Sequence, residues 1–330
     1  MLEAVRRLQG GRVLVIGDII QDEYWRGHTT RINPEAPGAF LLDVEEKSYS
    51  PGGAANVAVN VAMLGGKASL IGVVGMDSYG NQMSDILKGI GVHPAIIQQK
   101  ERPTIVKTRL IAEGRQIGRA DVEITDDFPD DIQKAIVHSI KNEMAWADAV
   151  IIADYAKGVF SKNVSHETMA IADKLNKFIL VDPYPPTIRD WKLYNGATAI
   201  CPNLREFGQC GKTPEQLMNN SGIIAIARTE GENGVTLFQK YAEDIHFDSE
   251  VVEVFDVAGC GDTFAAAFAL GQIAYESLKK SAFVANIAAG IVAGKTGTAS
   301  VFPNELEKSL ALKEEAVSVL GMGLMSENPQ

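Results

Sequence analysis

The run Arg12-Val13-Leu14-Val15-Ile16-Gly17, followed at once by Asp18, decides the fold. Its apolar centre, ended by a glycine and an aspartate, predicts a strand that is buried on both faces. Four further short apolar runs have the same character, at residues 68–74 (ASLIGVV), 149–153 (AVIIA), 178–181 (FILV) and 223–227 (IIAIA). Strands without a polar side are typical of a mostly parallel sheet, because such sheets are covered by helices on both faces.

Segments with a helical pattern lie between and after these runs. They are residues 54–64, 82–90, 132–143 and 167–176, and towards the end of the chain residues 261–275, 278–295 and 305–320. Strands that alternate with helices indicate an α/β fold with a doubly wound sheet. Sheets of this kind bind ligands at the carboxyl ends of their strands, so polar residues just after a strand are the first candidates for a site.

Two stretches, at about residues 24–50 and 102–122, alternate apolar and polar side chains instead. This pattern predicts antiparallel strands in a small β-sheet beside the main one, which we call the lid. No repeat, low-complexity tract or linker divides the chain, so we expect one domain over residues 1–330. The polar end of the chain, residues 321–330, is expected to be disordered.

The composition excludes several classes of protein. Of 330 residues 46% are hydrophobic, enough for a large core, and 31 Lys and Arg against 42 Asp and Glu give a net charge of −11. An acidic chain repels nucleic acid and anionic membranes. Three cysteines without paired spacing favour a reducing compartment over a disulfide framework. No signal peptide or membrane span is evident. We therefore expect a cytoplasmic protein without nucleic-acid or membrane partners.

The segment from Asp256 to Phe264, DVAGCGDTF, is the strongest candidate for chemistry. It follows a strand-like run at residues 250–255 and precedes a helix of small residues. Gly259 and Gly261 would let backbone N–H groups converge on an anion at the helix N-terminus. Asp262, placed beside that anion, could act as a general base towards an attacking hydroxyl. The alternative is an aspartate that merely caps a helix.

Two other places suit a polyhydroxylated ligand. Gly52 and Gly53 open a helix that carries Asn56, whose amide can both donate to and accept from hydroxyl groups. Asp18 and Asp22 follow the first strand, where an open α/β sheet places its ligands. Tight helix packing at the glycines, and a capped or solvated loop at the aspartates, remain the alternatives.

Asn203 and Glu206 stand three residues apart after a short strand. They could hold Mg²⁺ through its water shell, or they could form a capping box at the start of a helix. Four cations, Lys107, Arg109, Arg119 and Lys157, could contact a phosphate or be solvated charges. Residues 289–296 (AGIVAGKT) loosely match a phosphate-binding P-loop, but the residues before them predict a helix rather than the strand that a P-loop follows.

Together these motifs resemble the ribokinase-like (PfkB) carbohydrate kinases, over about residues 13–307. Within that family the chain is most similar to the heptose 7-phosphate kinases of lipopolysaccharide-core biosynthesis. The finer match rests on residues 15–18, 22–27, 31–37 and 51–58, on Lys107-Thr108-Arg109 and Asp154-Tyr155-Ala156-Lys157-Gly158, and on residues 202–207, 285–290 and 294–298. Many motifs in the right order are more specific than any one of them.

The resemblance implies an ATP-dependent transferase that uses Mg²⁺ and a monovalent cation such as K⁺. Asp262 would be the catalytic base, and Gly259, Cys260 and Gly261 its anion hole. The sugar phosphate would be bound by Asp18, Asp22, Gly52, Gly53, Asn56, Lys107, Arg109 and Lys157. The nucleotide would be bound by Asn203, Glu206, Arg228, Gly231, Asn286, Ala289 and Gly290, with Glu206 reaching Mg²⁺ through water and Asp256 binding the monovalent cation. The lid would cover the sugar and form a homodimer.

The chain departs from the family pattern in places. Ala258 and Cys260 replace a threonine and an alanine beside the anion hole, and Ala227 replaces a threonine before Arg228. Tyr184 and Pro185 stand where heptose kinases have lysine and glycine. Two alternatives therefore remain. One is a kinase for another sugar or a nucleoside, and the other is a catalytically weak regulator that binds sugar or nucleotide. We expect the kinase part alone, without the nucleotidyltransferase domain that accompanies it in bifunctional relatives.

Overall fold

A computed structural model of the chain describes residues 2–31, 33–36, 38–183, 191–249, 257–295, 297 and 299–319. Its main sheet has nine strands in the order β13-β12-β11-β10-β9-β8-β1-β4-β5. They are β1 Arg12–Gly17, β4 Lys67–Gly75, β5 His93–Gln99, β8 Ala149–Ala153, β9 Phe178–Asp182, β10 Ala199–Ile200, β11 Ala225–Thr229, β12 Val235–Gln239 and β13 Ile245–Phe247. In this spatial order, all strands from β11 across to β5 pair in parallel. At the other edge, β12 pairs antiparallel with β11, and β13 pairs antiparallel with β12. The predicted α/β sheet is confirmed.

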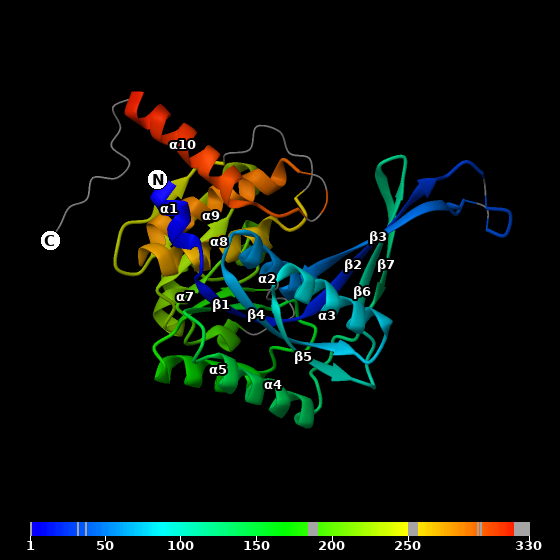
Figure 1. Cartoon of the computed structure of the whole chain (residues 1–330). Helices are drawn as coiled ribbons and strands as arrows, with labels where there is room; N and C mark the ends of the chain where they lie inside the picture. The colour runs from blue at the N-terminus through cyan, green and yellow to red at the C-terminus, as the bar shows by residue number, and fades with distance from the viewer. Residues whose placement is uncertain are drawn as a thin grey trace.

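Helices cover both faces of this sheet, as Figure 1 shows. One face packs against α1 Leu2–Leu8, α2 Ala54–Met63, α3 Ser78–Ile90, α8 Cys260–Tyr275, α9 Leu278–Ala293 and α10 Pro303–Val319. The other face packs against α4 Asp130–Glu143, α5 Lys162–Lys174, α6 Leu204–Gly208, α7 Pro214–Ser221 and the short 3₁₀ turn η1 Trp191–Tyr194. A second 3₁₀ turn, η2, spans Gly231–Asn233.

The predicted strands differ from the observed ones mainly at the sheet edges. β1 and β8 have the predicted bounds, whereas β11 begins two residues later than expected. β5, β12 and β13 were not predicted. β5 lies at an edge and is only partly buried, so its sequence lacks the unbroken apolar run that marks a central strand.

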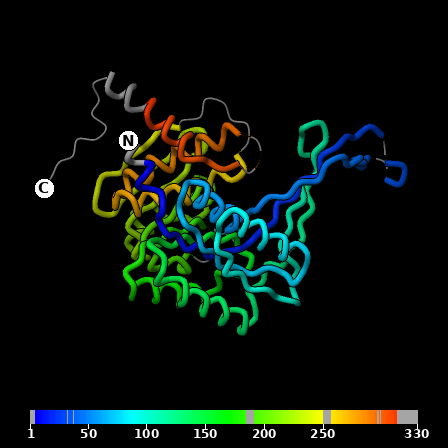
Figure 2. Tube along the Cα trace, in the orientation of Figure 1, coloured from blue at the N-terminus to red at the C-terminus, as the bar shows by residue number. Residues whose placement is uncertain are grey.

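The lid is a separate four-stranded sheet in the order β3-β2-β6-β7. Its strands are β2 Ile19–His28, β3 Asp43–Gly53, β6 Ile105–Ala112 and β7 Arg115–Val122, and Figure 2 shows them projecting from the end of the molecule that lies away from α1. The expectation of antiparallel strands throughout is wrong, because β2 and β6 pair in parallel. Both strands leave the same end of the parallel main sheet and therefore run outward side by side.

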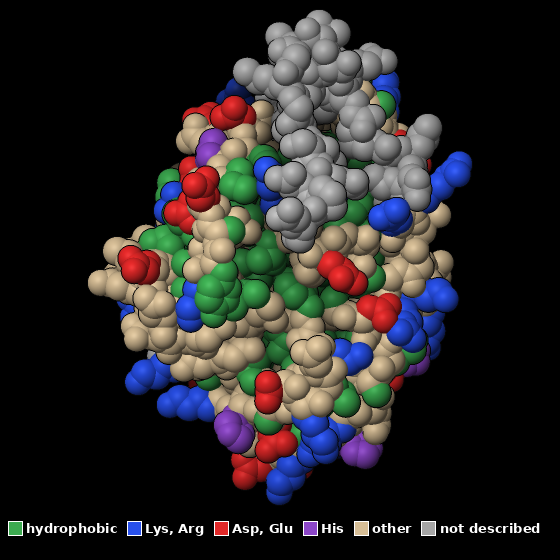
Figure 3. All heavy atoms as spheres, turned by 90° about the vertical axis from the view of Figure 1, so that its left-hand side faces the viewer, with side chains coloured by type: hydrophobic (Ala, Val, Ile, Leu, Met, Phe, Trp, Pro, Cys, Tyr) green, Lys and Arg blue, Asp and Glu red, His purple; other side chains and the backbone are tan. Residues whose placement is uncertain are grey.

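Residues 289–293 belong to α9, so the P-loop alternative is wrong because no strand precedes the glycines. The expected tail at residues 321–330 and the strand-like run at 250–255 lie outside the described residues. In the described part of the chain, no helix has the length and apolar character to cross a bilayer. On the face in Figure 3, hydrophobic side chains gather in the centre, while acidic and basic side chains are interspersed around the rim.

Candidate active site

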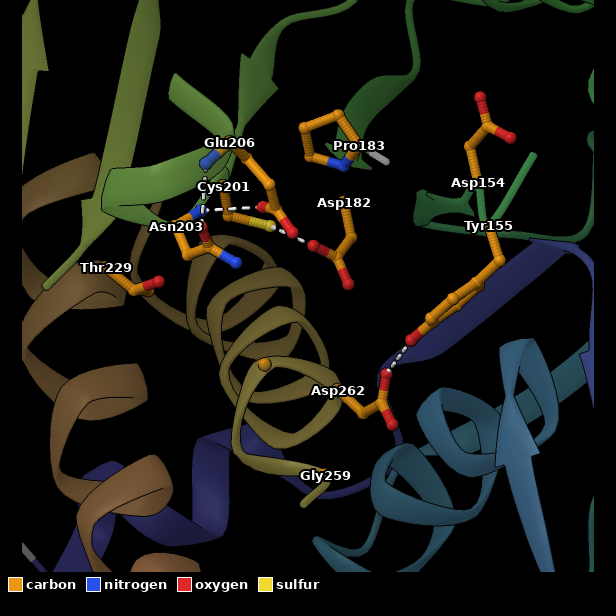
Figure 4. A pocket seen from close by; sticks show the side chains of 11 residues that line it. Asp154, Tyr155, Asp182, Pro183, Cys201, Asn203, Glu206, Thr229, Gly259 and Asp262 are labelled. Atoms are coloured by element: carbon orange, nitrogen blue, oxygen red, sulfur yellow. Dashed lines mark hydrogen bonds between the residues drawn. The ribbon is translucent and has the colours of Figure 1, made fainter. Parts of the chain in front are cut away.

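The sheet order changes direction at β1, since the chain next adds β4 and β5 on one side and later β8 to β11 on the other. At such a switch point the carboxyl ends of the strands leave a crevice. Next to this point, at the carboxyl ends of β8 to β11, the structure has a cavity of about 180 Å³, shown in Figure 4. It is lined by Asp154, Tyr155, Asp182, Pro183, Cys201, Asn203, Glu206, Thr229, Gly259, Gly261 and Asp262.

Asp262 lies in the first turn of α8, at one wall of this cavity. Gly259 precedes the helix with φ of 83°, a left-handed conformation that costs glycine nothing and lets the chain turn sharply into the helix. At Gly261 an added Cβ would meet no atom of the described residues within 4 Å, so with respect to those residues the N-terminus of α8 is open to a ligand. N–H groups of a first helical turn lack acceptors within the helix and attract anions.

The Asp262 carboxylate is buried and is held by two donors. Asn56 Nδ2 donates to Oδ2 and the Tyr155 hydroxyl donates to Oδ1, each over 2.5 Å. Burial raises the pKa of Asp262 to about 6, and these two hydrogen bonds oppose the rise. A carboxyl group with that pKa is mostly ionised at neutral pH and is a stronger base than an ordinary aspartate, as general-base catalysis requires.

Asp18, expected to bind the sugar, anchors the turn after β8. Its carboxylate accepts hydrogen bonds from the backbone N–H groups of Tyr155 (2.9 Å), Lys157 (3.0 Å) and Val159 (3.1 Å). Burial and the neighbouring Asp154 raise the pKa of Asp18 to about 6. The capped-loop alternative therefore describes what this side chain does in the structure.

Asn203 and Glu206 form the complete capping box of α6. Asn203 Oδ1 accepts from the N–H of Glu206, and Glu206 Oε2 accepts from the N–H of Asn203, both over 2.8 Å. Glu206 also faces the cavity, together with Asp182 at the end of β9 (Figure 4). Burial raises the pKa of Asp182 well above its usual range, and the carboxylates of Glu206, Asp262 and Asp154 add to the rise.

These carboxylates suit a hard divalent cation. Mg²⁺ prefers oxygen ligands and keeps several of its waters, so one or two carboxylates in a roomy polar cavity are sufficient. Asp182 and Glu206 supply such oxygens. Burial raises the pKa of both, neighbouring carboxylates add to the rise at Asp182, and a cation beside them would favour their ionised forms. Among the described residues no three His, Cys, Asp or Glu side chains converge on one point as a ready-made metal site.

The cations expected at the sugar end have different surroundings. Arg109 forms an ion pair with buried Asp22 at 2.5 Å, and Lys157 forms one with Glu123 at 2.7 Å. Within the described part of the chain, no carboxylate lies in ion-pair contact with Lys107, whose ammonium is 6.0 Å from the centre of the Tyr155 ring. Burial lowers the pKa of Lys107. Of these three cations, Lys107 is therefore the one whose ammonium can bind a ligand without first breaking an ion pair with a described carboxylate.

The glycines expected near the sugar pack closely against Asp18 and Asp22. A Cβ at Gly52 would lie 2.3 Å from Asp22 Oδ2, and one at Gly53 would lie 2.5 Å from the Asp18 carbonyl oxygen. Both glycines end β3, immediately before α2 begins and brings Asn56 to Asp262. The Gly-Gly pair thus permits close packing and also delivers Asn56 to the site.

The residues expected to bind the nucleotide only partly meet at the cavity. Arg228 is paired with Glu230 at 2.7 Å, and the Asn286 amide donates to the Asp248 carbonyl oxygen at 2.8 Å. Arg228, Gly231, Asn286, Ala289 and Gly290 are not among its lining residues. Asp256, expected to bind a monovalent cation, lies outside the described residues, as do Tyr184 and Pro185.

Six cavity residues had no predicted role, namely Asp154, Tyr155, Asp182, Pro183, Cys201 and Thr229. Asp154 and Tyr155 directly follow β8, and Asp182 ends β9. The rule that ligands bind at the carboxyl ends of parallel strands, applied to each predicted strand, would have identified these three. It would not have identified the contact between Tyr155 and Asp262.

A family model described as pfkB family carbohydrate kinase matches residues 12–305 of the chain. A curated relative, the bifunctional protein HldE of Erwinia tasmaniensis, is 38% identical over 326 residues, which cover 96% of this chain and 66% of that protein. The chain thus spans about two thirds of the length of the curated relatives that it matches.

Two solved structures share the fold. Arabidopsis thaliana ribokinase complexed with ribose and ATP superposes with a TM-score of 0.70 at 19% identity, covering 92% of this chain and 99% of that one. A protein from E. coli in complex with ATP and Mg²⁺ superposes with a TM-score of 0.71 at 17% identity, with the same coverage. At these identities the likeness concerns the fold alone.

Proposed function

The chain belongs to the pfkB family of carbohydrate kinases, and from that premise we propose that it transfers the γ-phosphoryl group of MgATP to the 1-hydroxyl of D-glycero-D-manno-heptose 7-phosphate. Membership makes the chain a phosphotransferase that acts on a sugar. The choice of sugar rests on the 36–38% identity to HldE proteins. The single observation that supports the chemistry is the buried Asp262 carboxylate, with its raised pKa, in the first turn of α8.

In the proposed reaction Asp262 accepts the proton of the attacking hydroxyl. A bond forms between the sugar oxygen and the γ-phosphorus, the bond from that phosphorus to the bridging oxygen breaks, and ADP leaves. The N–H groups at Gly259, Cys260 and Gly261 offset the charge on the transferred group, as donors at a helix N-terminus can. Ala258 and Cys260, which stand in place of the family's threonine and alanine, are both small and are compatible with this backbone arrangement.

For the cations, we propose that Glu206 and Asp182 hold Mg²⁺ through its waters and that Asp256 helps to bind K⁺. Bound Mg²⁺ would neutralise phosphate charge and orient the nucleotide. The support is the pair of carboxylates facing the cavity and the rise of their pKa values, which a cation would reverse. Around them we propose that Asn203, Arg228, Gly231, Asn286, Ala289 and Gly290 contribute to the nucleotide site.

We propose that the substrate's own phosphate binds at Lys107. Arg109 and Lys157 already have carboxylate partners, whereas Lys107 is half-buried beside Tyr155. Replacing Lys107 with Met should raise KM for a phosphorylated sugar about 10- to 100-fold, since a charge-assisted hydrogen bond is worth about 1.5–3 kcal/mol. The KM for MgATP should not change. Lys47→Met is the matched control, because Lys47 lies on the exposed part of the lid against Trp25.

One observation favours a different sugar, namely Tyr184 and Pro185 in place of the lysine and glycine of heptose kinases. A coupled ADP-release assay with MgATP decides between the candidates. Its panel contains heptose 7-phosphate, sedoheptulose 7-phosphate, fructose 6-phosphate, ribose, fructose and adenosine. Preference for heptose 7-phosphate supports the proposal. Preference for another compound keeps the kinase and changes its substrate, and no turnover of any compound favours the binding-only regulator.

A further inference from the structure

The two oxygens of the Asp262 carboxylate are held from two separate elements. Asn56 Nδ2 reaches Oδ2 from α2, and the Tyr155 hydroxyl reaches Oδ1 from the turn after β8, both at 2.5 Å. Figure 4 shows the Tyr155 ring extending toward Asp262, with its hydroxyl directed at the carboxylate. Because each oxygen has its own donor, the carboxylate is fixed in one orientation.

The turn that carries Tyr155 is itself held in one arrangement. Asp18 accepts backbone hydrogen bonds from three of its residues, starting with Tyr155. Ala156 and Gly158 have positive φ values of 55° and 103°, which residues other than glycine rarely adopt. At Gly158 a Cβ would lie 2.4 Å from the Asp126 carbonyl oxygen. The backbone that carries the Tyr155 ring is therefore held rigidly.

The Tyr155 hydroxyl is a donor and not a second base. Burial raises the pKa of this phenol well above its usual value, and the negative charge of Asp262 adds to the rise. The phenol therefore keeps its proton at neutral pH. Its hydrogen bond stabilises the ionised form of Asp262, which is the form that can accept a proton.

We propose that Tyr155 is a positioning residue for phosphoryl transfer, whose hydroxyl orients the Asp262 carboxylate so that its remaining lone pairs face the attacking sugar hydroxyl. It acts through Asp262 and does not touch the transferred group. The inference rests on the proposed role of Asp262 as the base. It does not depend on which sugar is the substrate.

The test compares Tyr155→Phe with Tyr194→Phe. Tyr194 is a matched control, since its buried hydroxyl donates to Asp154 Oδ2 at 2.9 Å and not to Asp262. Tyr155→Phe should lower kcat about 10- to 100-fold, as expected for the loss of a hydrogen bond to a charged group. It should leave KM for MgATP unchanged and move the acid limb of the kcat profile to higher pH. Tyr194→Phe should not move that limb.

The pH readout separates positioning from general structural damage. The other charged groups that act on Asp262 are Asp22, which raises its pKa, and Lys107, which lowers it, while Asp182 lies across the cavity. None of them is altered by Tyr155→Phe, and Asp18 is present in every variant. A fall in kcat without any movement of the acid limb would overturn the proposal. So would an unchanged or higher kcat, which would make Tyr155 a placeholder that the sugar displaces.

A second measurement needs no turnover. The ¹³Cγ signal of Asp262, assigned by its absence from Asp262→Asn, should titrate at higher pH in Tyr155→Phe than in the wild-type protein. If Tyr155→Phe does not fold, fluorotyrosine at position 155 keeps the ring and makes the phenol a stronger donor. The signal should then titrate at lower pH. An unchanged titration contradicts the positioning role even if no sugar is turned over, whereas absent turnover with a shifted titration contradicts only the proposed function.

Discussion

At the scale of single residues, the environment of Asp262 decides what the side chain can do. Burial makes it a stronger base than a solvated aspartate, while Asn56 and Tyr155 keep it ionised near neutral pH. The pKa of Asp262 is therefore set by two opposing effects, desolvation, which raises it, and hydrogen bonding, which lowers it. Two predictions follow from this balance.

Replacing Asp262 with Asn removes the proton acceptor and keeps the shape of the side chain. We expect kcat to fall about 100- to 10,000-fold, the usual contribution of a general base. MgATP binding should persist, because the backbone of α8 and the carboxylates of Asp182 and Glu206 are unchanged. Steady-state kinetics and nucleotide titration by calorimetry measure the two effects. Near-normal kcat in this variant would reject Asp262 as the base.

The pH profile should carry the signature of this carboxyl. Because burial raises the pKa of Asp262 to about 6, the base becomes protonated, and inactive, as the pH falls through about 6. We expect kcat at saturating Mg²⁺ and ATP to be level above about pH 7 and to decline below it. A decline only near pH 4 would mean that the working base is a solvated carboxylate.

At the scale of elements, the junction of β3 and α2 joins the lid to the site. Gly52 leaves room for Asp22, whose partner Arg109 comes from β6. Gly52→Ala would place a Cβ 2.3 Å from Asp22 Oδ2 and force this pair apart. We expect KM for the sugar to rise about tenfold or more, from about 1–3 kcal/mol of overpacking, with little change for ATP.

The control for this variant is Gly118→Ala in the lid strand β7, where, among the described residues, a Cβ would meet only Leu110, at 3.5 Å. Equal effects of both substitutions on KM would show that the lid tolerates no added methyl group anywhere. They would remove the argument for a specific role of Asp22. Kinetics with varied sugar at fixed MgATP separate the two results.

At the scale of the whole molecule, the lid projects from the domain and exposes large apolar side chains. These are Phe40, Val44, Tyr49 and Val122. We propose that lids of two copies pack together, since exposed apolar residues on a protruding sheet mark an interaction surface. Light scattering should then show a dimer, and Tyr49→Glu with Val122→Glu should give monomers. A monomeric wild-type protein at micromolar concentration would contradict this.

We retain the proposal that residues 1–330 form one kinase domain. Its support is the continuous sheet from β5 to β13 and the helices that cover it on both faces. Limited proteolysis should cut first outside the main sheet and leave its strands together. An early cut that released a stable half would instead indicate two units.

The sequence by itself determined the parallel sheet, its helical layers and the motif at the N-terminus of α8. These depend on local patterns, such as the apolar run of β1 and the glycines around Cys260, which act through neighbours along the chain. The candidate base and the capping box of Asn203 and Glu206 were predictable for the same reason.

Only the tertiary structure decided which side chains meet. Asp262 contacts Tyr155 and Asn56, which are 107 and 206 positions away in the sequence. It also decided the parallel pairing of β2 with β6, the role of Asp18 as a backbone anchor, and which lid cations have carboxylate partners. Hydrogen bonds and ion pairs of this kind depend on distance in space, and local sequence patterns carry no information about contacts between distant segments.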